Sequence, residues 1–320
     1  MTANRTDGWL TADLPASVDL RDGRVLWLFG DTWTGARLPD GGIAPGARLQ
    51  HNSALLQTGG CVDLVGAAGA GWLTIPGTED FWWPADGIVP GGRRGRVVDV
   101  FVTRVRRTGP GIFDFALAGM DVVRLRRADL AVLDVRPLPY QDRLWASSVV
   151  ADGGWLYLFG RDRTAGPSMY LARARARDLD GRWEFRSGRR WSRDPARATP
   201  VLSVPPFNNP SVTRLHDGRW LAIAKDREFD GTAVLGWTAR TPHGPWKATG
   251  PLVTAPTSGR PDEFTYMAAS HPEITLANKR LLVSWNLNSR AAGLDDLADP
   301  LMASYGPRFA GIRLPRHGRR

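Results

Sequence analysis

The chain has 320 residues, of which 42% are hydrophobic, so it can form one large core or two small ones. A single cysteine, Cys61, excludes an internal disulfide bond and a cysteine-based metal cluster. The formal net charge of +10 is of the sign that favours nucleic acid. However, the arginines are dispersed and alternate with alanine at Arg173, Arg175 and Arg177, as on the exposed face of an outer strand. We therefore expect no nucleic-acid partner.

The beginning of the chain shows no export or membrane signal. Residues 1–10 lack the basic start and the apolar run of a signal peptide, and no stretch of about 18 apolar residues is present to span a bilayer. We therefore expect no membrane partner and a cytoplasmic location, or secretion if a leader has been removed.

One pattern repeats along the chain and predicts its architecture. A short apolar strand is followed by a turn of the Asp-Gly type and by a second apolar strand that ends in polar residues. The second strands lie about 64 residues apart, and a third and often a fourth strand follow each of them. The five copies of the hairpin cover residues 16–31, 86–106, 146–162, 209–226 and 271–288.

Five units of about four strands each predict an all-β chain that folds as a five-bladed β-propeller. The 36 glycines and 24 prolines suit the many turns of such a fold. A β-sandwich would place its strands at shorter spacing without this period. Because no linker or long helix marks a second domain, we expect residues 1–320 to form a single domain, and we expect a monomer.

The hairpin geometry predicts that polar residues collect at one end of the propeller axis. In an antiparallel hairpin the start of the first strand lies beside the end of the second. The resulting mix of carboxylates, amides and tryptophans suits a carbohydrate, because amides and charges bind hydroxyls and indoles stack on sugar rings. Asp and Asn can also cap turns, and Trp can pack between blades. The candidate substrate-binding residues are Trp33, His51, Asn52, Trp82, Trp83, Asn209, Lys225, Tyr266, His271 and Asn286.

Several motifs of the chain match a known family in their order. They are LFGDTW at 28–33 followed by Asn52 and Ser53, WPADG at 83–87, Tyr266 with HPE at 271–273, and SWNLNS at 284–289. On these residues the chain resembles the five-bladed β-propeller, glycosidase-like proteins of bacteria that include endo-D-arabinanases. The resemblance implies a fold shared with furanose-cleaving hydrolases, an active site at one end of the propeller axis, and carboxylates as the catalytic groups.

Three carboxylates fit the chemistry that this resemblance implies. Glycoside hydrolysis needs one carboxylic acid to protonate the leaving oxygen and one carboxylate to attack the anomeric carbon or activate water. Asp31, at the end of the apolar strand 25–29, is the expected base or nucleophile. Glu273 is the expected general acid, with His271 nearby to tune its pKa, and Asp86 would orient the substrate or modulate the acid.

Other functions of the same residues stay open. Glu273 could pair with Arg290 or Lys225, and Asp31 could cap the turn that follows it. The alternatives to an arabinan-like furanoside hydrolase are a non-catalytic carbohydrate-binding propeller, an intracellular enzyme acting on a glycosylated small metabolite, and a protein scaffold with an exposed apolar patch. We expect no cofactor, and no metal either, because His51 and His271 lack zinc-motif spacing. The expected partner is a carbohydrate or a glycosylated small molecule.

Overall fold

The computed structural model describes residues 8–39, 43–66, 71–111, 114–164, 166–207, 209–257, 259–260, 262–290 and 305–314. Strands dominate this part of the chain, which confirms the all-β expectation. Its helical segments are the short 3-10 turns η1 (Gly92–Arg94), η2 (Pro195–Arg197) and η3 (Ala277–Lys279). None of the helices in these ranges has the length and apolar character needed to cross a membrane.

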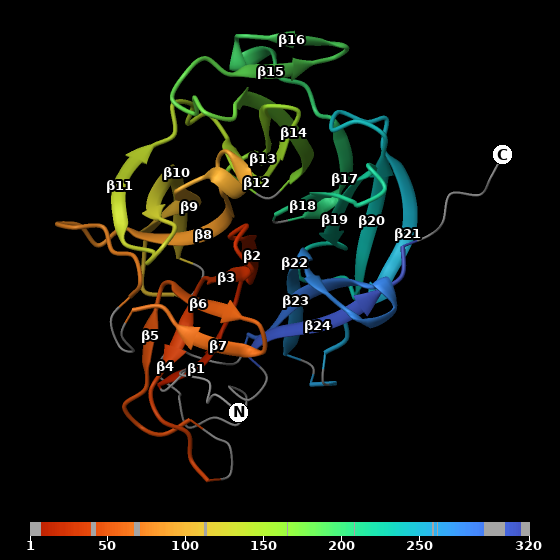
Figure 1. Cartoon of the computed structure of the whole chain (residues 1–320). Coiled ribbons are helices and arrows are strands. Elements are labelled where there is room, and N and C mark those ends of the chain that lie inside the picture. The colour runs from red at the N-terminus through yellow and green to blue at the C-terminus, as the bar shows by residue number, and fades with distance from the viewer. Residues whose placement is uncertain are drawn as a thin grey trace.

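The strands form six antiparallel sheets, and five of them surround an axis and are numbered here in chain order (Figure 1). Sheet 1 contains β2 (Ala16–Asp19), β3 (Arg24–Phe29), β6 (Ser53–Thr58) and β7 (Cys61–Leu64). Sheet 2 contains β8 (Phe81–Ile88), β9 (Val97–Arg107), β10 (Phe115–Arg126) and β11 (Val132–Pro137). Sheet 3 contains β12 (Leu144–Asp152), β13 (Trp155–Arg161), β14 (Gly166–Arg175), β15 (Glu184–Ser187) and β16 (Arg190–Ser192), with β17 (Leu202–Phe207) paired to β14.

The remaining sheets complete the circle and add a small layer beside it. Sheet 4 contains β18 (Ser211–Arg214), β19 (Trp220–Lys225), β20 (Ala233–Ala239) and β21 (Lys247–Thr254). Sheet 5 contains β22 (Glu263–Thr275), β23 (Leu281–Ser289) and β24 (Gly306–Ile312). The sixth sheet contains β1 (Trp9–Ala12), β4 (Thr32–Thr34) and β5 (Arg48–Gln50), and it lies next to sheet 1 (Figure 1).

The first strand of each numbered sheet faces the axis. β2, β8, β12, β18 and β22 contact one another in a closed circle (Figure 1) and line a cavity of about 720 Å³. Hydrogen bonds join four of the five neighbouring pairs. These run from Val149 N to Asp86 Oδ2 (2.6 Å), from Val212 N to Ser148 Oγ (3.0 Å), from Ser270 N to Ser211 Oγ (3.0 Å), and between Ser17 Oγ and His271 Nδ1 (2.5 Å).

Apolar side chains pack the faces of neighbouring sheets against each other. One cluster joins sheets 2 and 3 through Phe101, Met120, Trp145 and Trp183. Similar clusters join sheets 1 and 2, sheets 3 and 4, and sheets 4 and 5. Because Trp145, Trp183 and Trp220 are fully buried in these clusters, their indoles serve packing and are not available to a ligand.

Trp183 gives a direct test of this packing. Its indole is fully buried, its Nε1 donates to the carbonyl of Leu179 at 2.7 Å, and its ring packs against Tyr140. We expect Trp183→Ala to lower the free energy of unfolding by about 3–5 kcal/mol, because it removes a large buried ring and leaves a cavity. Chemical denaturation measures the effect. A loss no larger than that of Trp72→Ala, at a partly exposed indole, would contradict the assignment.

Two of the first strands begin earlier than the hairpin pattern predicts. β8 begins at Phe81 and β22 at Glu263, whereas the pattern placed the starts near Asp86 and His271. Each of these strands contains a register shift, which interrupts the alternation from which a strand is read in a sequence. Asp86 and Glu273 therefore lie farther along their strands, toward the hairpin turns.

Candidate functional site

Asp31 stands at the end of the axis where the first strands begin, which we call the mouth. It follows β3, and its side chain is 23% exposed. Its Oδ1 accepts two hydrogen bonds, from His51 Nδ1 at 3.0 Å and from Trp83 Nε1 at 2.9 Å. No hydrogen bond between described residues uses Oδ2 of Asp31. The carboxylate is therefore held by one oxygen, while the other is available to a water molecule or a substrate.

An aromatic group fixes the two residues that hold Asp31. The His51 ring stacks on Phe81 with 3.6 Å between the ring centroids and 16° between the planes. Phe81 in turn meets Trp83 edge to face, and Trp83 meets Phe115 in the same way. These contacts restrict the rotamers of both donors, so the Asp31 carboxylate is oriented before any ligand arrives.

Asp13 lies directly beside Asp31 and is buried, with 8% of its surface exposed. Its backbone N–H donates to the Asp31 carbonyl at 3.0 Å, and its Oδ2 accepts a hydrogen bond from the Tyr266 hydroxyl at 2.7 Å. The Tyr305 hydroxyl donates to the Asp31 carbonyl at 2.9 Å. Burial, reinforced by the charge of Asp31, raises the pKa of Asp13 to about 8. Asp13 is therefore protonated at neutral pH and places no second negative charge against Asp31.

Gly30 makes the close approach of Asp13 possible. A Cβ added at Gly30 would lie 2.6 Å from Oδ1 of Asp13, an oxygen that is buried without a hydrogen-bond partner among the described residues. Since such a contact is too short for a carbon and an oxygen, any side chain at this position would displace the Asp13 carboxyl. The glycine of the LFGDTW motif thus has a packing role next to Asp31.

Replacing Asp13 by asparagine tests its protonation state. The pKa of Asp13 in the folded protein, about 8, lies above its ordinary value of 3.8, so this group stabilises the fold fully at low pH. That stability is lost as the pH rises toward 8. Asparagine is neutral at every pH. We therefore expect the free energy of unfolding of Asp13→Asn to rise by several kcal/mol relative to that of the wild type between pH 4 and pH 9. Denaturant titrations across this range measure the free energy of unfolding of both proteins. If the two free energies change with pH in the same way, Asp13 does not have a raised pKa.

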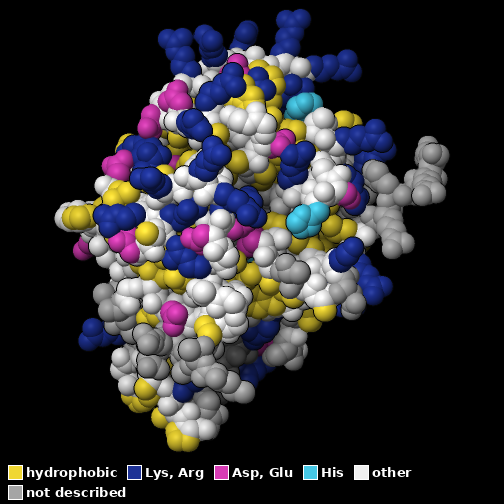
Figure 2. Space-filling model, in the orientation of Figure 1, with side chains coloured by type: hydrophobic (Ala, Val, Ile, Leu, Met, Phe, Trp, Pro, Cys, Tyr) yellow, Lys and Arg dark blue, Asp and Glu magenta, His cyan; other side chains and the backbone are white. Residues whose placement is uncertain are grey.

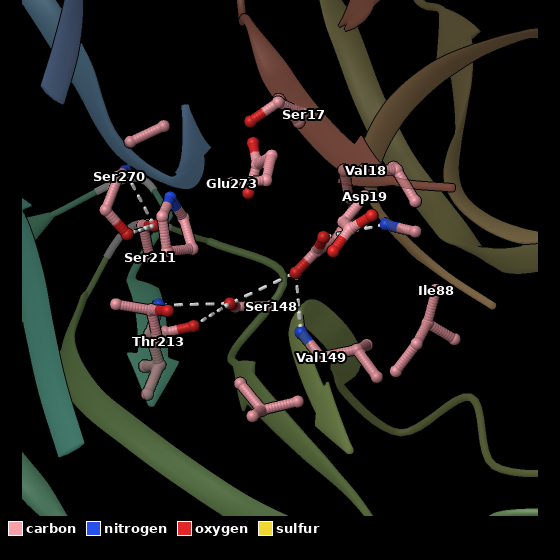
Figure 3. A pocket seen from close by; sticks show the side chains of 18 of the residues that line it. Ser17, Val18, Asp19, Ile88, Ser148, Val149, Ser211, Thr213, Ser270 and Glu273 are labelled. Carbon is pink, nitrogen blue, oxygen red and sulfur yellow. Dashed lines mark hydrogen bonds between the residues drawn. The ribbon is translucent and has the colours of Figure 1, made fainter. Parts of the chain in front are cut away.

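The cavity below the mouth carries three further carboxylates, from Asp19, Asp86 and Glu273, among many hydroxyl groups. Figure 3 labels Asp19 and Glu273 together with the serines around them. Asp86 accepts hydrogen bonds from the backbone N–H groups of Val149 and Gly87 and from Ser148 Oγ. Burial raises the pKa of Asp86 to about 6, against the effect of these three donors. Because Val149 and Ser148 lie on β12, Asp86 also joins β8 to the next first strand.

Glu273 has the properties of a proton donor. Burial is the main cause that raises its pKa to about 7; a hydrogen bond with Ser17 opposes this effect, and the charges of Asp86 and Asp19 add to it. Its Oε1 is buried and has no hydrogen-bond partner among the described residues. Neither of the expected basic partners is paired with it. Arg290 instead pairs with Asp230 at 3.4 Å.

His271 lies two residues before Glu273 but faces the contact between β22 and β2. Its Nδ1 lies 2.5 Å from Ser17 Oγ and its Nε2 lies 2.8 Å from Ser284 Oγ. Burial lowers the pKa of His271 to about 3, so the ring is neutral at physiological pH. Its connection to Glu273 runs through their shared neighbour Ser17.

Four other expected ligand contacts are occupied inside the protein. Trp33 is buried in an apolar cluster beside Leu10, and the amide of Asn52 bonds the backbone of Leu73. Trp82 Nε1 donates to Asp121 Oδ2 at 2.7 Å. The last of the four, Asn286, accepts a hydrogen bond from Leu14 N and donates to the Met267 carbonyl. These side chains hold the mouth in shape.

Two basic residues lie at the ends of second strands in sheets 3 and 4. Arg161 donates to Asn209 Oδ1 at 2.8 Å, and burial lowers its pKa to about 10. Lys225 donates to the carbonyls of Asp226 and Gly231, and burial lowers its pKa to about 8. Within the described ranges no group of three or more His, Cys, Asp or Glu side chains is arranged to hold a metal ion.

The structure brings Asp31, His51 and Trp83 together at the mouth, and Asp86 and Glu273 together in the cavity. Asp31 is not among the residues that line the cavity. Asp13 was not expected from the sequence. Its burial depends on tyrosines more than 250 residues away, so no local pattern marks it.

Comparison with known proteins gives a family and a fold. A family model described as "Domain of unknown function (DUF5005)" matches residues 2–313. No curated protein matches the sequence. A Bacteroides ovatus protein described provisionally as a hydrolase is 18% identical with a TM-score of 0.77, and the match covers 96% of this chain and 87% of that one.

Two further solved structures belong to glycosidases. A GH43_1 enzyme from Xanthomonas citri, complexed with xylotriose, is 15% identical with a TM-score of 0.55, over 95% of this chain and 87% of that one. An exo-β-1,3-galactanase from Phanerochaete chrysosporium, with β-1,3-galactotriose, is 11% identical with a TM-score of 0.54, over 98% of this chain and 65% of that one. At these identities the similarity shows the fold, which is the β-propeller that the repeat predicted.

Proposed function

The chain belongs to the family described as "Domain of unknown function (DUF5005)", and we propose that it is a glycoside hydrolase of five-bladed propeller architecture that acts on an arabinan-like furanoside. The observation that carries the proposal is the Asp31 carboxylate, which two donors orient at the mouth of the axis. Oriented carboxylates are the groups on which glycoside hydrolysis depends. The glycosidases with the same fold support the reaction class by analogy.

Asp31 acts as the base or nucleophile in this proposal. His51 and Trp83 hold Oδ1, so Oδ2 is the oxygen that would attack the anomeric carbon or activate water. Asp13 is a positioning residue, because its protonated carboxyl is buried and reaches the reaction through Asp31. A second ionised carboxylate at this place would raise the cost of keeping Asp31 charged.

Glu273 acts as the general acid, and Asp86 modulates it. A pKa of about 7 leaves Glu273 protonated in a large fraction of molecules at neutral pH and still able to release its proton. The charge of Asp86 contributes to that pKa. The cavity of about 720 Å³ falls in the range of ligand pockets, so a sugar residue can enter it from the mouth.

The substrate would bind across the mouth, where the protein offers polar and aromatic side chains. Trp83 is partly exposed and offers an indole edge beside Asp31. Asn209, which lines the cavity just before β18, would bind hydroxyl groups, while Tyr266 and His51 flank Asp13 and Asp31. Lys225, also expected to bind substrate, is buried with its Nζ bonded to backbone carbonyls, so it takes no part in this proposal. A furanoside ring or a small glycosylated metabolite fits this description, and the polymeric substrate is arabinan in our proposal.

A second function is favoured by one observation. Asp31 lies outside the lining of the cavity that contains Glu273, so the two carboxyl groups occupy different levels of the axis. A propeller in which no carboxylate pair stands at working distance would bind a carbohydrate without cleaving it. The same Trp83 and amide groups would then form a binding site only.

A substrate panel tests the proposal. The wild-type protein is incubated with aryl furanosides, aryl pyranosides and D-arabinan fragments, and released aglycone or reducing ends are measured. We expect turnover of furanosides and of D-arabinan fragments. Turnover confined to pyranosides would overturn the furanoside assignment, and binding without turnover of any compound would favour the second function.

A further inference from the structure

The outer edge of sheet 3 carries a stack of alternating guanidinium and indole groups. Arg175 lies 3.8 Å from the centroid of Trp155, and Arg173 lies 4.1 Å from the centroids of both Trp155 and Trp191. Arg186 follows at 5.6 Å from Trp191. These five residues come from β13 to β16, and we call them the arginine–tryptophan ladder.

Strand pairing explains why the ladder forms. Trp155 pairs with Arg175 across β13 and β14, and Arg186 pairs with Trp191 across β15 and β16. Alternation along β14 places Arg173 and Arg175 on one face, with small alanines between them on the other. The cation–π contacts fix the guanidinium planes, which would otherwise rotate freely in solvent.

The surface around the ladder has an excess of positive charge. Residues 173–197 contain nine arginines and four acidic residues. Figure 2 shows Lys and Arg side chains standing along the edge of the molecule that holds β15 and β16 in Figure 1. No ion pair among the described residues involves Arg175, Arg186 or Arg190. Burial, with the charge of Arg173 as the second cause, lowers the pKa of Arg186.

One carboxylate of the protein already occupies the ladder. Glu184 Oε2 accepts hydrogen bonds from Nε of Arg173 at 2.7 Å and lies 2.6 Å from its NH2 group. The edge of a stacked guanidinium therefore binds a carboxylate here, with the guanidinium as the donor. Arg175 and Arg186 belong to the same ladder and have no such partner among the described residues.

The aromatic faces of the ladder are covered, which limits what can bind. Arg173 lies between the two indoles, and Arg175 covers Trp155 as well. Two guanidinium groups therefore crowd the Trp155 ring within about 4 Å of its centroid. A sugar ring or an unstacked nucleobase would have to displace a guanidinium to stack there, so recognition is expected to use the arginines.

We propose that the arginine–tryptophan ladder binds a carboxylate-bearing polysaccharide. Arginine binds carboxylates strongly through its fork of N–H donors, and Arg173 already directs its Nε and NH2 groups to one oxygen of Glu184. The successive arginines of a rigid ladder match the repeated carboxylates of a uronate polymer. The ladder belongs to the outer strands of sheet 3, away from the mouth, so its binding is independent of the proposed hydrolysis (Figure 1).

Binding of polygalacturonate tests the proposal. The affinity is measured by affinity electrophoresis or calorimetry for polygalacturonate and for its fully methyl-esterified form, which has the same backbone without charge. We expect the wild type to bind only the charged polymer, more weakly at high salt. The double variant Arg175→Gln with Arg186→Gln should weaken binding roughly tenfold or more, because two charge-assisted contacts are lost.

Two further variants separate the ladder from general charge. Arg93→Gln with Arg94→Gln removes the same charge from exposed positions of η1 and should leave the affinity unchanged. Arg175→Lys with Arg186→Lys keeps the charge without the planar fork and should weaken binding severalfold. The proposal is overturned if the ladder and control variants lose affinity equally, or if the lysine variant binds as tightly as the wild type. It is also overturned if DNA binds the wild type as tightly as polygalacturonate does at the same salt, or if polygalacturonate does not bind. Binding is read without turnover, so it does not depend on the mouth.

Discussion

Asp31→Asn should lower kcat/KM for a furanoside by a factor of roughly 10² to 10⁴, the range expected when a catalytic acid–base group is removed. The amide keeps the shape of the side chain and can still accept from Trp83 Nε1, but it cannot attack carbon or take a proton from water. Initial rates on an aryl furanoside measure the change.

The matched control for this variant is Asp63→Asn on β7 of the same sheet. It removes one carboxylate at a partly exposed position away from Asp31, and we expect its rates and its unfolding curve to match the wild type. If Asp31→Asn hydrolyses the furanoside as fast as the wild type and as Asp63→Asn, the assignment of Asp31 as base or nucleophile is wrong.

Glu273→Gln should produce the second large effect, a loss of roughly 10² to 10⁴ in kcat on substrates whose leaving group needs a proton. The loss of kcat should be much smaller for aryl furanosides with an acidic leaving group, since such a leaving group departs without being protonated. The wild-type kcat should fall as the pH rises through about 7, because only the protonated form of Glu273 can act as the acid. The glutamine variant should lack this dependence.

The stability of the same variant checks the protonation state independently of activity. The pKa of Glu273 in the folded protein, about 7, is higher than its ordinary value of 4.5, so its stabilising contribution is full below pH 4.5 and is lost as the pH rises through 7. Between pH 4 and pH 8, the free energy of unfolding of Glu273→Gln should rise by roughly 1–3 kcal/mol relative to that of the wild type. Asp63→Asn, which lies outside the cavity, is the control for activity here as well and should keep wild-type rates.

The repeat of hairpins predicted an all-β propeller, but not the additional small sheet of β1, β4 and β5. Each hairpin is a local feature, since its two strands are adjacent in sequence and its turn residues are specific, so the pattern of 16–31 or 146–162 is legible without the structure. The starts of β8 and β22 were misplaced because register shifts break the alternation there. The consequence is that Asp86 and Glu273 lie below the mouth.

The candidate site was predictable only in part, for a related reason. Asp31 with His51 belongs to one sheet and its loop, and Trp83 comes from the neighbouring first strand, so the hairpin geometry brought them together. Asp13 acquires its raised pKa from tertiary burial against Tyr266, which sequence neighbours do not encode. Likewise Asn52 has the composition of a ligand contact, yet its amide is used by the backbone.

The most direct test of the central claim compares hydrolysis and binding of one D-arabinan oligosaccharide by the wild type and Asp31→Asn. Reducing ends are measured in one set of samples and binding heat in another, at the same pH and salt. Our account predicts that the wild type cleaves the oligosaccharide, while Asp31→Asn binds it with similar affinity and leaves it intact. Binding by the wild type without cleavage would contradict the account and make the mouth a carbohydrate-binding site.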